Sequence, residues 1–173
     1  ISYRSGYRLD VAEVARLARA RGALCLADSY QAAGAIPLDV RELGVDLLTA
    51  GTVKYLLASA GLAFMFVRDD LHERLLPTQT GWFADEDIFR MDISDYSPAA
   101  DARRFDSGTP PVPNIYAGLA GMRIVEEAGV DAIEAHVRGL VDLLVAGLDE
   151  LGATVVTPRG EGDHGPLVCI AST

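Results

Sequence analysis

The sequence predicts an α/β fold with a mainly parallel sheet. Residues 23–27 and 45–49 are short, continuous apolar runs of the kind that a parallel sheet buries on both faces. Residues 10–21 precede the first run and carry apolar side chains at helical spacing, from a capping Asp10 to a terminating Gly22. Strands that alternate with helices in this way are typical of α/β proteins.

The rest of the chain is expected to contain one long irregular stretch. Residues 77–113 hold five of the eight prolines and the only tryptophan, which predicts long loops of the kind that are usually functional. The acidic cluster Asp85-Glu86-Asp87 in this stretch is expected to be solvated. The remaining elements are expected as a strand at 62–67, a short helix at 69–75, helices at 114–127 and 130–151, and strands at 153–157 and 167–171.

Two structural units are expected. The chain begins and ends within expected strands, so we expect it to be the middle portion of a longer protein. The long helix at 130–151 is suited to connect one domain to the next. We therefore assign residues 1–129 to part of a large domain, and residues 130–173 to a bridging helix and the start of a small C-terminal α+β domain.

Composition restricts the function classes. Half of the 173 residues are hydrophobic, which is enough for one sizeable core. The formal net charge of −10 argues against nucleic-acid binding, and the longest uncharged apolar run, 55–67, is too short to span a bilayer. Cys25 and Cys169 lie in apolar runs and predict buried free thiols, which indicates a cytoplasmic protein. No metal site is expected, because the three histidines share no ligand spacing.

Two chemically useful side chains follow the two predicted parallel strands. Asp28 comes directly after the first strand, and Lys54 lies a few residues beyond the second. Ligands of such sheets bind beyond the carboxyl ends of the strands. Taken alone, however, a loop lysine is more often a solvated charge, and an aspartate at a strand end is more often a cap. The pair by itself leaves both interpretations open.

Together with Gln31, these residues have the chemistry that pyridoxal 5′-phosphate (PLP) requires of a protein. A lysine amine holds the aldehyde of PLP as a Schiff base, which is a role for Lys54. A carboxylate such as that of Asp28 keeps the pyridine nitrogen protonated, so that the ring can withdraw electrons. The amide of Gln31 is a neutral donor for the ring hydroxyl.

Six ordered motifs resemble the central block of class V aminotransferases, which are PLP-dependent enzymes of fold type I. That superfamily includes cysteine desulfurases, selenocysteine lyases, kynureninases and isopenicillin epimerase-like enzymes. The resemblance covers nearly the whole chain and implies the large domain of the PLP-dependent transferase fold. The motifs are Leu26-Ala27-Asp28-Ser29-Tyr30-Gln31-Ala32-Ala33-Gly34, Pro37-Leu38-Asp39-Val40, Val45-Asp46, Gly51-Thr52-Val53-Lys54-Tyr55-Leu56, Gly81-Trp82-Phe83, and Arg104-Phe105-Asp106-Ser107-Gly108-Thr109-Pro110.

The resemblance implies a role for each residue of the first and fourth motifs that could carry chemistry. Lys54 holds the cofactor and, once an amino acid has displaced it, moves the Cα proton. Asp28 pairs with the pyridinium nitrogen, and Gln31 donates to the ring hydroxyl oxygen. Tyr30 and Ala32 are expected to pack rather than to take part in the chemistry.

The chain departs from the family pattern just before the lysine. Many relatives carry a serine and a histidine there that contact the phosphate or lie nearby, and this chain has Gly51 and Val53. Thr52 is therefore the expected hydroxyl donor to the phosphate. The resemblance further implies that Thr109 and Trp82 reach toward the phosphate of the neighbouring subunit in a homodimer. The phosphate loop and the arginine that binds the substrate carboxylate are expected outside this chain.

The sequence thus predicts a PLP-dependent enzyme that acts on an amino acid through a Lys54 Schiff base. The reaction at Cα stays open between a desulfurase or other lyase, an epimerase and a transaminase, and the Gly-Trp-Phe motif leans slightly away from the desulfurases. The alternative is a non-catalytic or truncated PLP-fold fragment that serves as a structural or dimerisation piece.

Overall fold

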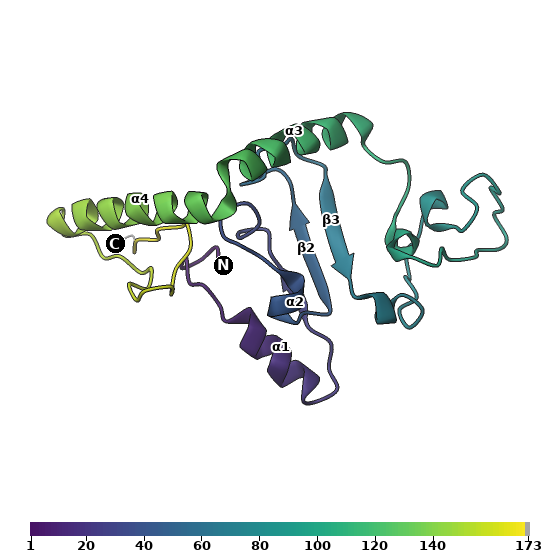
Figure 1. Cartoon of the computed structure of the whole chain (residues 1–173), viewed down its shortest axis with the longest axis horizontal. Coiled ribbons are helices and arrows are strands. Elements are labelled where there is room, and N and C mark those ends of the chain that lie inside the picture. The colour runs from purple at the N-terminus through teal and green to yellow at the C-terminus, as the bar shows by residue number, and fades with distance from the viewer. Residues whose placement is uncertain (172–173) are drawn as a thin grey trace.

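The computed structural model describes residues 1–171, which form a three-stranded sheet, helices around it and two peripheral parts (Figure 1). The elements, in chain order, are α1 (Val11–Arg19), β1 (Leu26–Asp28), α2 (Val40–Leu43), β2 (Leu47–Gly51), β3 (Ala63–Val67), the 3-10 turns η1 (Asp69–Leu71), η2 (Trp82–Ala84) and η3 (Ala102–Phe105), and the helices α3 (Val112–Ala128) and α4 (Val130–Glu150).

The strand order is β1-β2-β3, and the first pair is parallel, as expected. In that pair Asp28 lies opposite Thr49, so β1 and β2 end at the same edge of the sheet. The second pair, β2 with β3, is antiparallel. Only residues 52–62 join these two strands. This connection is too short for a parallel return, which requires a longer crossover that usually contains a helix, so β3 runs antiparallel to β2.

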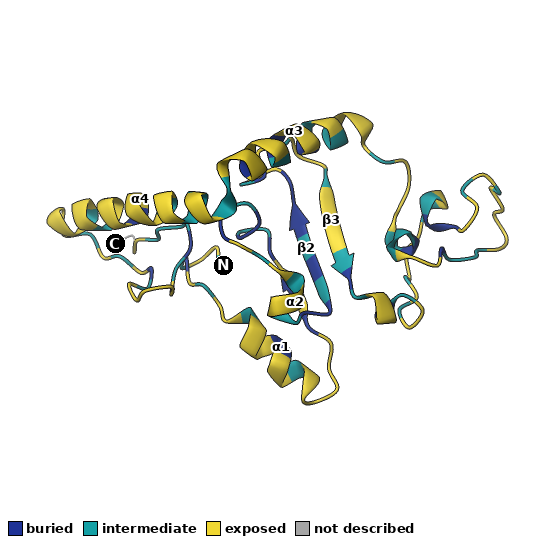
Figure 2. Cartoon of the chain, viewed as in Figure 1, coloured by how far each residue is buried: buried dark blue, intermediate teal, exposed yellow. Residues whose placement is uncertain are grey.

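One face of the sheet carries the main core. The helices α1 and α2 cover this face, and the buried residues of the cluster are Ala15, Cys25, Ala27, Val45 and Leu48. Figure 2 shows buried residues concentrated on β2, with exposed residues along most of α1 and α4. On the opposite face Leu26 of β1 is 56% exposed while Val67 of β3 is buried, so residues 1–171 cover that face only in part.

Helix α1 begins as its sequence predicts, because Asp10 accepts a hydrogen bond from the Glu13 N–H group at 2.9 Å. Strands β1 and β2 begin two to three residues later than expected. The reason is the buried carboxylate of Asp46, which accepts the Cys25 N–H group at 2.7 Å and pairs with Arg68. Because the Cys25 N–H group bonds to a side chain, regular strand pairing starts beyond it.

A long irregular segment, residues 77–111, stands away from the sheet in Figure 1, and we call it the arm. The expectation of long loops here is confirmed, with η2 and η3 as short turns inside them. Arg103 donates to the carbonyl oxygens of Phe83 and Asp85, at 3.0 and 2.7 Å. Arg104 is buried and donates to the Ala99 carbonyl oxygen at 2.8 Å. Two arginines therefore hold the arm together from within.

The C-terminal part is less regular than expected. The segments 153–157 and 167–171 form no ladder of their own, and they meet in a single antiparallel bridge between Val155 and Ile170.

The helices expected in the middle of the chain agree with the structure except for one. The expected helix at 69–75 is wrong in extent, since η1 is one 3-10 turn. Helix α4 starts directly after Gly129, whose φ of 78° separates it from α3.

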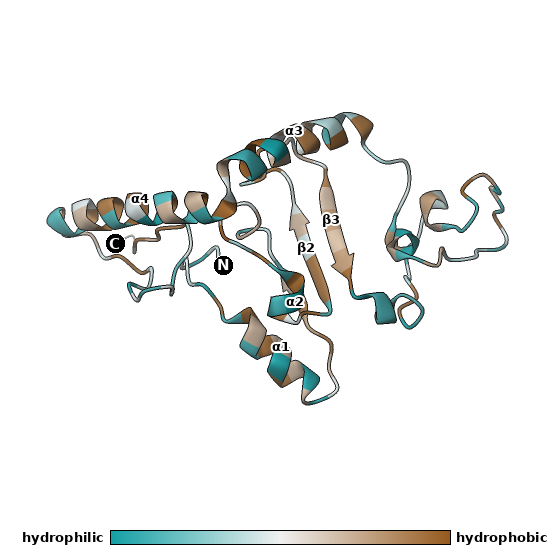
Figure 3. Ribbon diagram, viewed as in Figure 1, coloured by the Kyte–Doolittle hydropathy of each residue, from teal (hydrophilic) through white to brown (hydrophobic). Residues whose placement is uncertain are grey.

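The chain's first residues pack against this C-terminal part. Tyr7 forms an antiparallel bridge with His164, and Arg8 pairs with Glu134 of α4 at 2.6 Å. Figure 3 shows apolar residues on β2 and β3 and also along α4, where Leu140 and Leu143 are exposed. The division at residue 129 stays a prediction, and residues 172–173 lie outside the described part.

Two further findings bear on the compositional expectations. Both cysteines are free, with Cys25 buried and Cys169 half-buried. Within residues 1–171, none of the helices is long and apolar enough to cross a membrane.

We expect Asp46→Ala to lower the free energy of unfolding by about 1–3 kcal/mol, because the buried Cys25 N–H group loses its acceptor. Urea denaturation of the full natural chain checks this value. The matched control is Asp70→Ala, which removes the other carboxylate bound to Arg68 but at an exposed site, and which should cost less than about 1 kcal/mol. Equal losses for the two variants would contradict a special role for Asp46.

Candidate active site

Four of the six predicted site residues gather at the edge where β1 and β2 end. Asp28 is the last residue of β1, and Gln31 follows in the next turn. Thr52 and Lys54 follow directly after β2. The parallel pairing of the two strands is what brings these segments to one edge.

Tyr30 connects the acidic and the basic member of this group. Its backbone N–H group donates to Asp28 Oδ1 at 3.0 Å. Its ring lies below the Lys54 amine, with 5.3 Å between Nζ and the ring centroid, which is within the range of a cation–π contact. The sequence indicated only packing for Tyr30, whereas here it contacts both Asp28 and Lys54.

The backbone around Lys54 forms a tight turn. The Leu57 N–H group donates to the Lys54 carbonyl oxygen at 3.0 Å, and the Ala58 N–H group donates to the Thr52 carbonyl oxygen at 2.9 Å. Leu57 has a φ of 58°, in the left-handed region that side chains other than glycine rarely adopt. Such strain persists only where the surrounding packing imposes it.

Two glycines press directly on this turn. A Cβ atom on Gly34 would lie 2.5 Å from the Tyr55 carbonyl oxygen, and Gly34 also has a φ of 88°. A Cβ atom on Gly121 of α3 would lie 2.2 Å from the Leu56 carbonyl oxygen. No larger residue fits at either place without moving the turn. Close backbone contacts on two sides therefore fix the position of Lys54.

Thr52 and Gln31 differ in how their polar groups are used. Thr52 is 1% exposed, and both its N–H group and its hydroxyl donate to the Leu62 carbonyl oxygen, at 3.1 and 3.2 Å. The side-chain amide of Gln31 is half-buried and has no hydrogen-bond partner within residues 1–171. Gln31 is thus free to bind a ligand, while the Thr52 hydroxyl proton is already donated.

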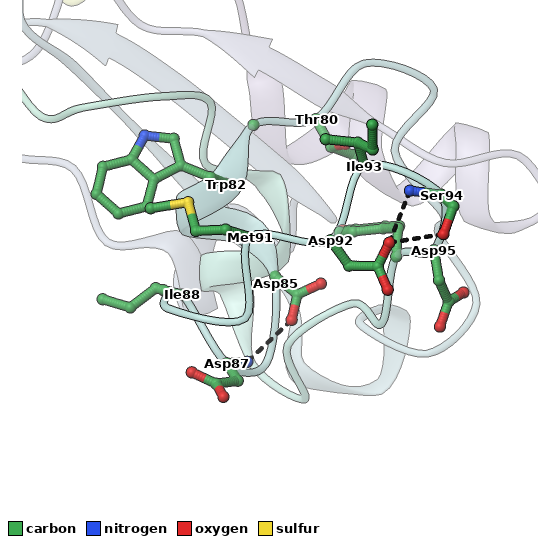
Figure 4. Close-up of a pocket in the computed structure, with 12 residues that line it drawn as sticks. Thr80, Trp82, Asp85, Asp87, Ile88, Met91, Asp92, Ile93, Ser94 and Asp95 are labelled. Atoms are coloured by element: carbon green, nitrogen blue, oxygen red, sulfur yellow. Dashed lines mark hydrogen bonds between the residues drawn. The ribbon is translucent and has the colours of Figure 1, made fainter.

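The other two predicted residues, Trp82 and Thr109, lie on the arm and away from Lys54. Trp82 stacks edge-on against Phe83, with 4.5 Å between ring centroids, and lines a hollow of about 420 Å³ with Met91 (Figure 4). This hollow is lined by residues 80–96 alone. Thr109 is exposed, just before α3. The chain by itself does not bring these two residues to the cofactor edge, and their role stays a prediction.

The two arm motifs pack against each other. A Cβ atom on Gly81 would lie 1.8 Å from the Ser107 carbonyl oxygen, so the Gly-Trp-Phe segment touches the segment that leads to Thr109. The arm is therefore one ordered piece that carries Trp82 and Thr109 together.

The expectation of a fully solvated acidic cluster is wrong for Asp85. Its side chain is buried, and it accepts from the Asp87 and Ser97 N–H groups and from Arg90 at 2.7 Å. Burial alone raises the pKa of Asp85, but the two backbone hydrogen bonds and Arg90 outweigh it and hold the pKa below the ordinary 3.8. Figure 4 shows the Asp85 contact with Asp87. Asp85 is thus a structural residue of the arm.

Lys54 is also unique in the sequence as a lysine. Of the 15 lysine and arginine residues in the chain, Lys54 is the only lysine. A primary side-chain amine therefore occurs once in the sequence, at the edge of the sheet. The neighbouring Tyr55 hydroxyl has its pKa raised by burial, so it stays neutral.

Comparison with known proteins identifies the family. The family model described as "Aminotransferase class-V" matches residues 1–172. The uncharacterized aminotransferase YcbU of Bacillus subtilis is 39% identical over 160 residues, which are 92% of this chain and 42% of that protein. A kynureninase of Deinococcus radiodurans is 30% identical over 173 residues, covering 97% of this chain and 42% of that protein. The chain thus spans about two fifths of these relatives.

Solved structures agree with the expected fold class. The apo cysteine desulfurase of Thermococcus onnurineus matches 99% of this chain and 42% of its own with a TM-score of 0.89 and 27% identity. A C-DES mutant with glycine covalently linked to its PLP cofactor matches with a TM-score of 0.83 and 21% identity, over 96% of this chain and 44% of that one. These likenesses confirm the fold type I α/β architecture.

Substitution of Gly121 should displace the Lys54 turn. We expect Gly121→Ala to cost about 1–3 kcal/mol of unfolding free energy, because the new methyl group overlaps the Leu56 carbonyl oxygen. The matched control is Gly139→Ala in α4, where no atom lies within 4 Å and where alanine should stabilise by about 0.5–1 kcal/mol. Urea denaturation measures both changes, and a stabilising Gly121→Ala would refute the close contact.

The arm should lose its order in acid. The lowered pKa of Asp85 means that its contribution to stability is complete above the ordinary carboxyl pKa and is lost as pH falls through the lowered value. We expect the fluorescence of Trp82, the only tryptophan, to report this transition below about pH 4. Asp85→Asn should abolish that part of the pH dependence, and an unchanged acid transition in this variant would contradict the assignment.

Proposed function

Because the chain belongs to the class V aminotransferase family, we propose that its protein is a PLP-dependent enzyme that acts on an amino acid and that Lys54 holds the cofactor. The observation that carries this proposal is the position of the chain's single lysine beyond the end of β2, with its amine over the ring of Tyr30, whose backbone N–H group bonds to Asp28. The family model covers nearly every residue, which supports the cofactor assignment.

The residues at this edge fit PLP. They offer an amine on Lys54, a carboxylate on Asp28 that uses one oxygen for a local hydrogen bond, and an amide on Gln31 that has no partner among the described residues. A cofactor with an aldehyde, a basic ring nitrogen and a ring hydroxyl is complementary to these three groups. PLP, when bound, supplies an electron-withdrawing ring that makes the Cα proton of an amino acid acidic.

Each residue then has a task that its position supports. Asp28 holds a proton on the ring nitrogen by its negative charge. Gln31 donates to the ring hydroxyl oxygen. Lys54, once displaced by the substrate amine, accepts the Cα proton on Nζ and returns it, while the close packing of Gly34 and Gly121 keeps the amine within reach.

The relatives differ in the bond that their reaction changes at Cα. The relative with 39% identity is an uncharacterized aminotransferase, which supports transamination, while kynureninases and probable cysteine desulfurases among the relatives support lyase chemistry. We favour an aminotransferase or epimerase, in agreement with the Gly-Trp-Phe motif of the arm. We also propose a cytoplasmic homodimer, in which the arm presents Trp82 and Thr109 to the partner's cofactor.

Borohydride reduction tests the role of Lys54. We expect reduction of the PLP-loaded full natural chain to fix the cofactor on Lys54 and to block tryptic cleavage there. Trypsin would then release residues 42–68 as one uncut, labelled peptide between Arg41 and Arg68. Peptide mass spectrometry measures this product.

Lys54→Ala should lose both the label and the visible absorption of the attached cofactor. The control is Arg74→Ala, an exposed cation outside the site that should keep both. A label on another residue, or no label on an intact protein, would leave the non-catalytic fragment as the better account.

A further inference from the structure

The hydroxyl group of Tyr30 lies in the site without a partner. The side chain is half-buried with its ring below the Lys54 amine, and the hydroxyl oxygen has no hydrogen-bond partner within residues 1–171. A half-buried tyrosine usually directs its hydroxyl to a polar group. The Tyr30 hydroxyl therefore remains available to a ligand at this edge of the sheet.

Gly51 makes room for this ring. A Cβ atom on Gly51 would lie 1.8 Å from the Tyr30 hydroxyl oxygen and 1.9 Å from Cζ. Gly51 belongs to β2, so its backbone is extended and does not itself require glycine. The glycine is needed for space, because the hydroxyl end of Tyr30 fills the volume that a side chain at position 51 would occupy.

The neighbouring hydroxyl group is already in use. The Thr52 hydroxyl donates its one proton to the Leu62 carbonyl oxygen at 3.2 Å, in a side chain that is 1% exposed. Tyr30 instead holds its ring 5.3 Å from the Lys54 amine. The Thr52 hydroxyl is therefore engaged within the protein, whereas the Tyr30 hydroxyl has no hydrogen-bond partner within residues 1–171 and can donate to a ligand.

We propose that Tyr30 is the hydroxyl donor to the phosphate group of PLP in this protein and that Gly51 is its spatial complement. The inference rests on the proposed function, since it requires PLP at Lys54. The carbon of PLP that bears the phosphate arm is adjacent to the carbon that bears the aldehyde, so a donor next to Lys54 can reach the phosphate. Hydrogen bonds to a phosphate dianion are charge-assisted and strong. Tyr30 thereby takes the role that the sequence indicated for Thr52.

The test compares PLP with pyridoxal, which lacks the phosphate group. Dissociation constants for both are measured by absorbance titration of the full natural chain. We expect Tyr30→Phe to weaken PLP binding roughly 10- to 100-fold, the effect of removing one hydrogen bond to a charged group, and to leave pyridoxal binding unchanged. Tyr3→Phe, at a tyrosine that is 72% exposed, is the matched control and should alter neither.

A residue swap tests the pairing of Tyr30 with Gly51. Gly51→Ser alone should weaken PLP binding, because its side chain overlaps the Tyr30 ring. Tyr30→Ala alone should weaken it by loss of the donor. The double variant Tyr30→Ala/Gly51→Ser restores a hydroxyl in the same space and should bind PLP more tightly than either single variant, a coupling that independent sites do not show.

Several outcomes separate this inference from the proposed function. If borohydride still attaches PLP to Lys54 but Tyr30→Phe weakens PLP and pyridoxal equally, or weakens neither, then Tyr30 has only a structural role and the inference is wrong. Additive losses in the double variant would also overturn it. If PLP fails to attach to Lys54 in the unaltered protein, the proposed function itself fails.

Discussion

The candidate site depends on backbone-to-backbone contact around the turn that carries Lys54. Gly34 presses on the Tyr55 carbonyl group from one side, and Gly121 of α3 presses on the Leu56 carbonyl group from another. A lysine side chain is long and flexible, so its amine is placed usefully only if its backbone is held. The strained φ of Leu57 is the local cost of holding the turn in this way.

The second constraint is the parallel alignment of β1 with β2 in the sheet. Parallel pairing places Asp28 opposite Thr49, so the residues that follow β1 and β2 emerge at one edge. Tyr30 then joins the two segments, through its N–H group to Asp28 and through its ring to Lys54. The arm forms a separate ordered piece held by Arg103 and Arg104, with its own hollow around Trp82. The chain thus presents two distinct features: the sheet edge that carries the candidate cofactor residues, and the projecting arm.

Local signals predicted the elements that depend on local interactions. The Asp10 cap and the helices α3 and α4 follow from interactions between residues close in sequence. The positions of Asp28 at the end of β1 and of Lys54 just after β2 were predicted in the same way. The later start of β1 and β2 was not predictable, because it depends on a carboxylate just before β2 that bonds to the backbone just before β1. The contact of Tyr30 with Gly51 joins residues far apart in the chain, and a large ring next to a glycine becomes informative only once β1 and β2 are paired.

The central claim is that Lys54, fixed by these contacts, holds PLP between Asp28 and Tyr30. A crystal structure of the full natural chain grown with PLP tests it most directly. Our account predicts electron density that is continuous from Lys54 Nζ to the cofactor, with the Asp28 carboxylate facing the ring nitrogen. Continuous density from a different residue, or a cofactor bound away from the shared edge of β1 and β2, would contradict it.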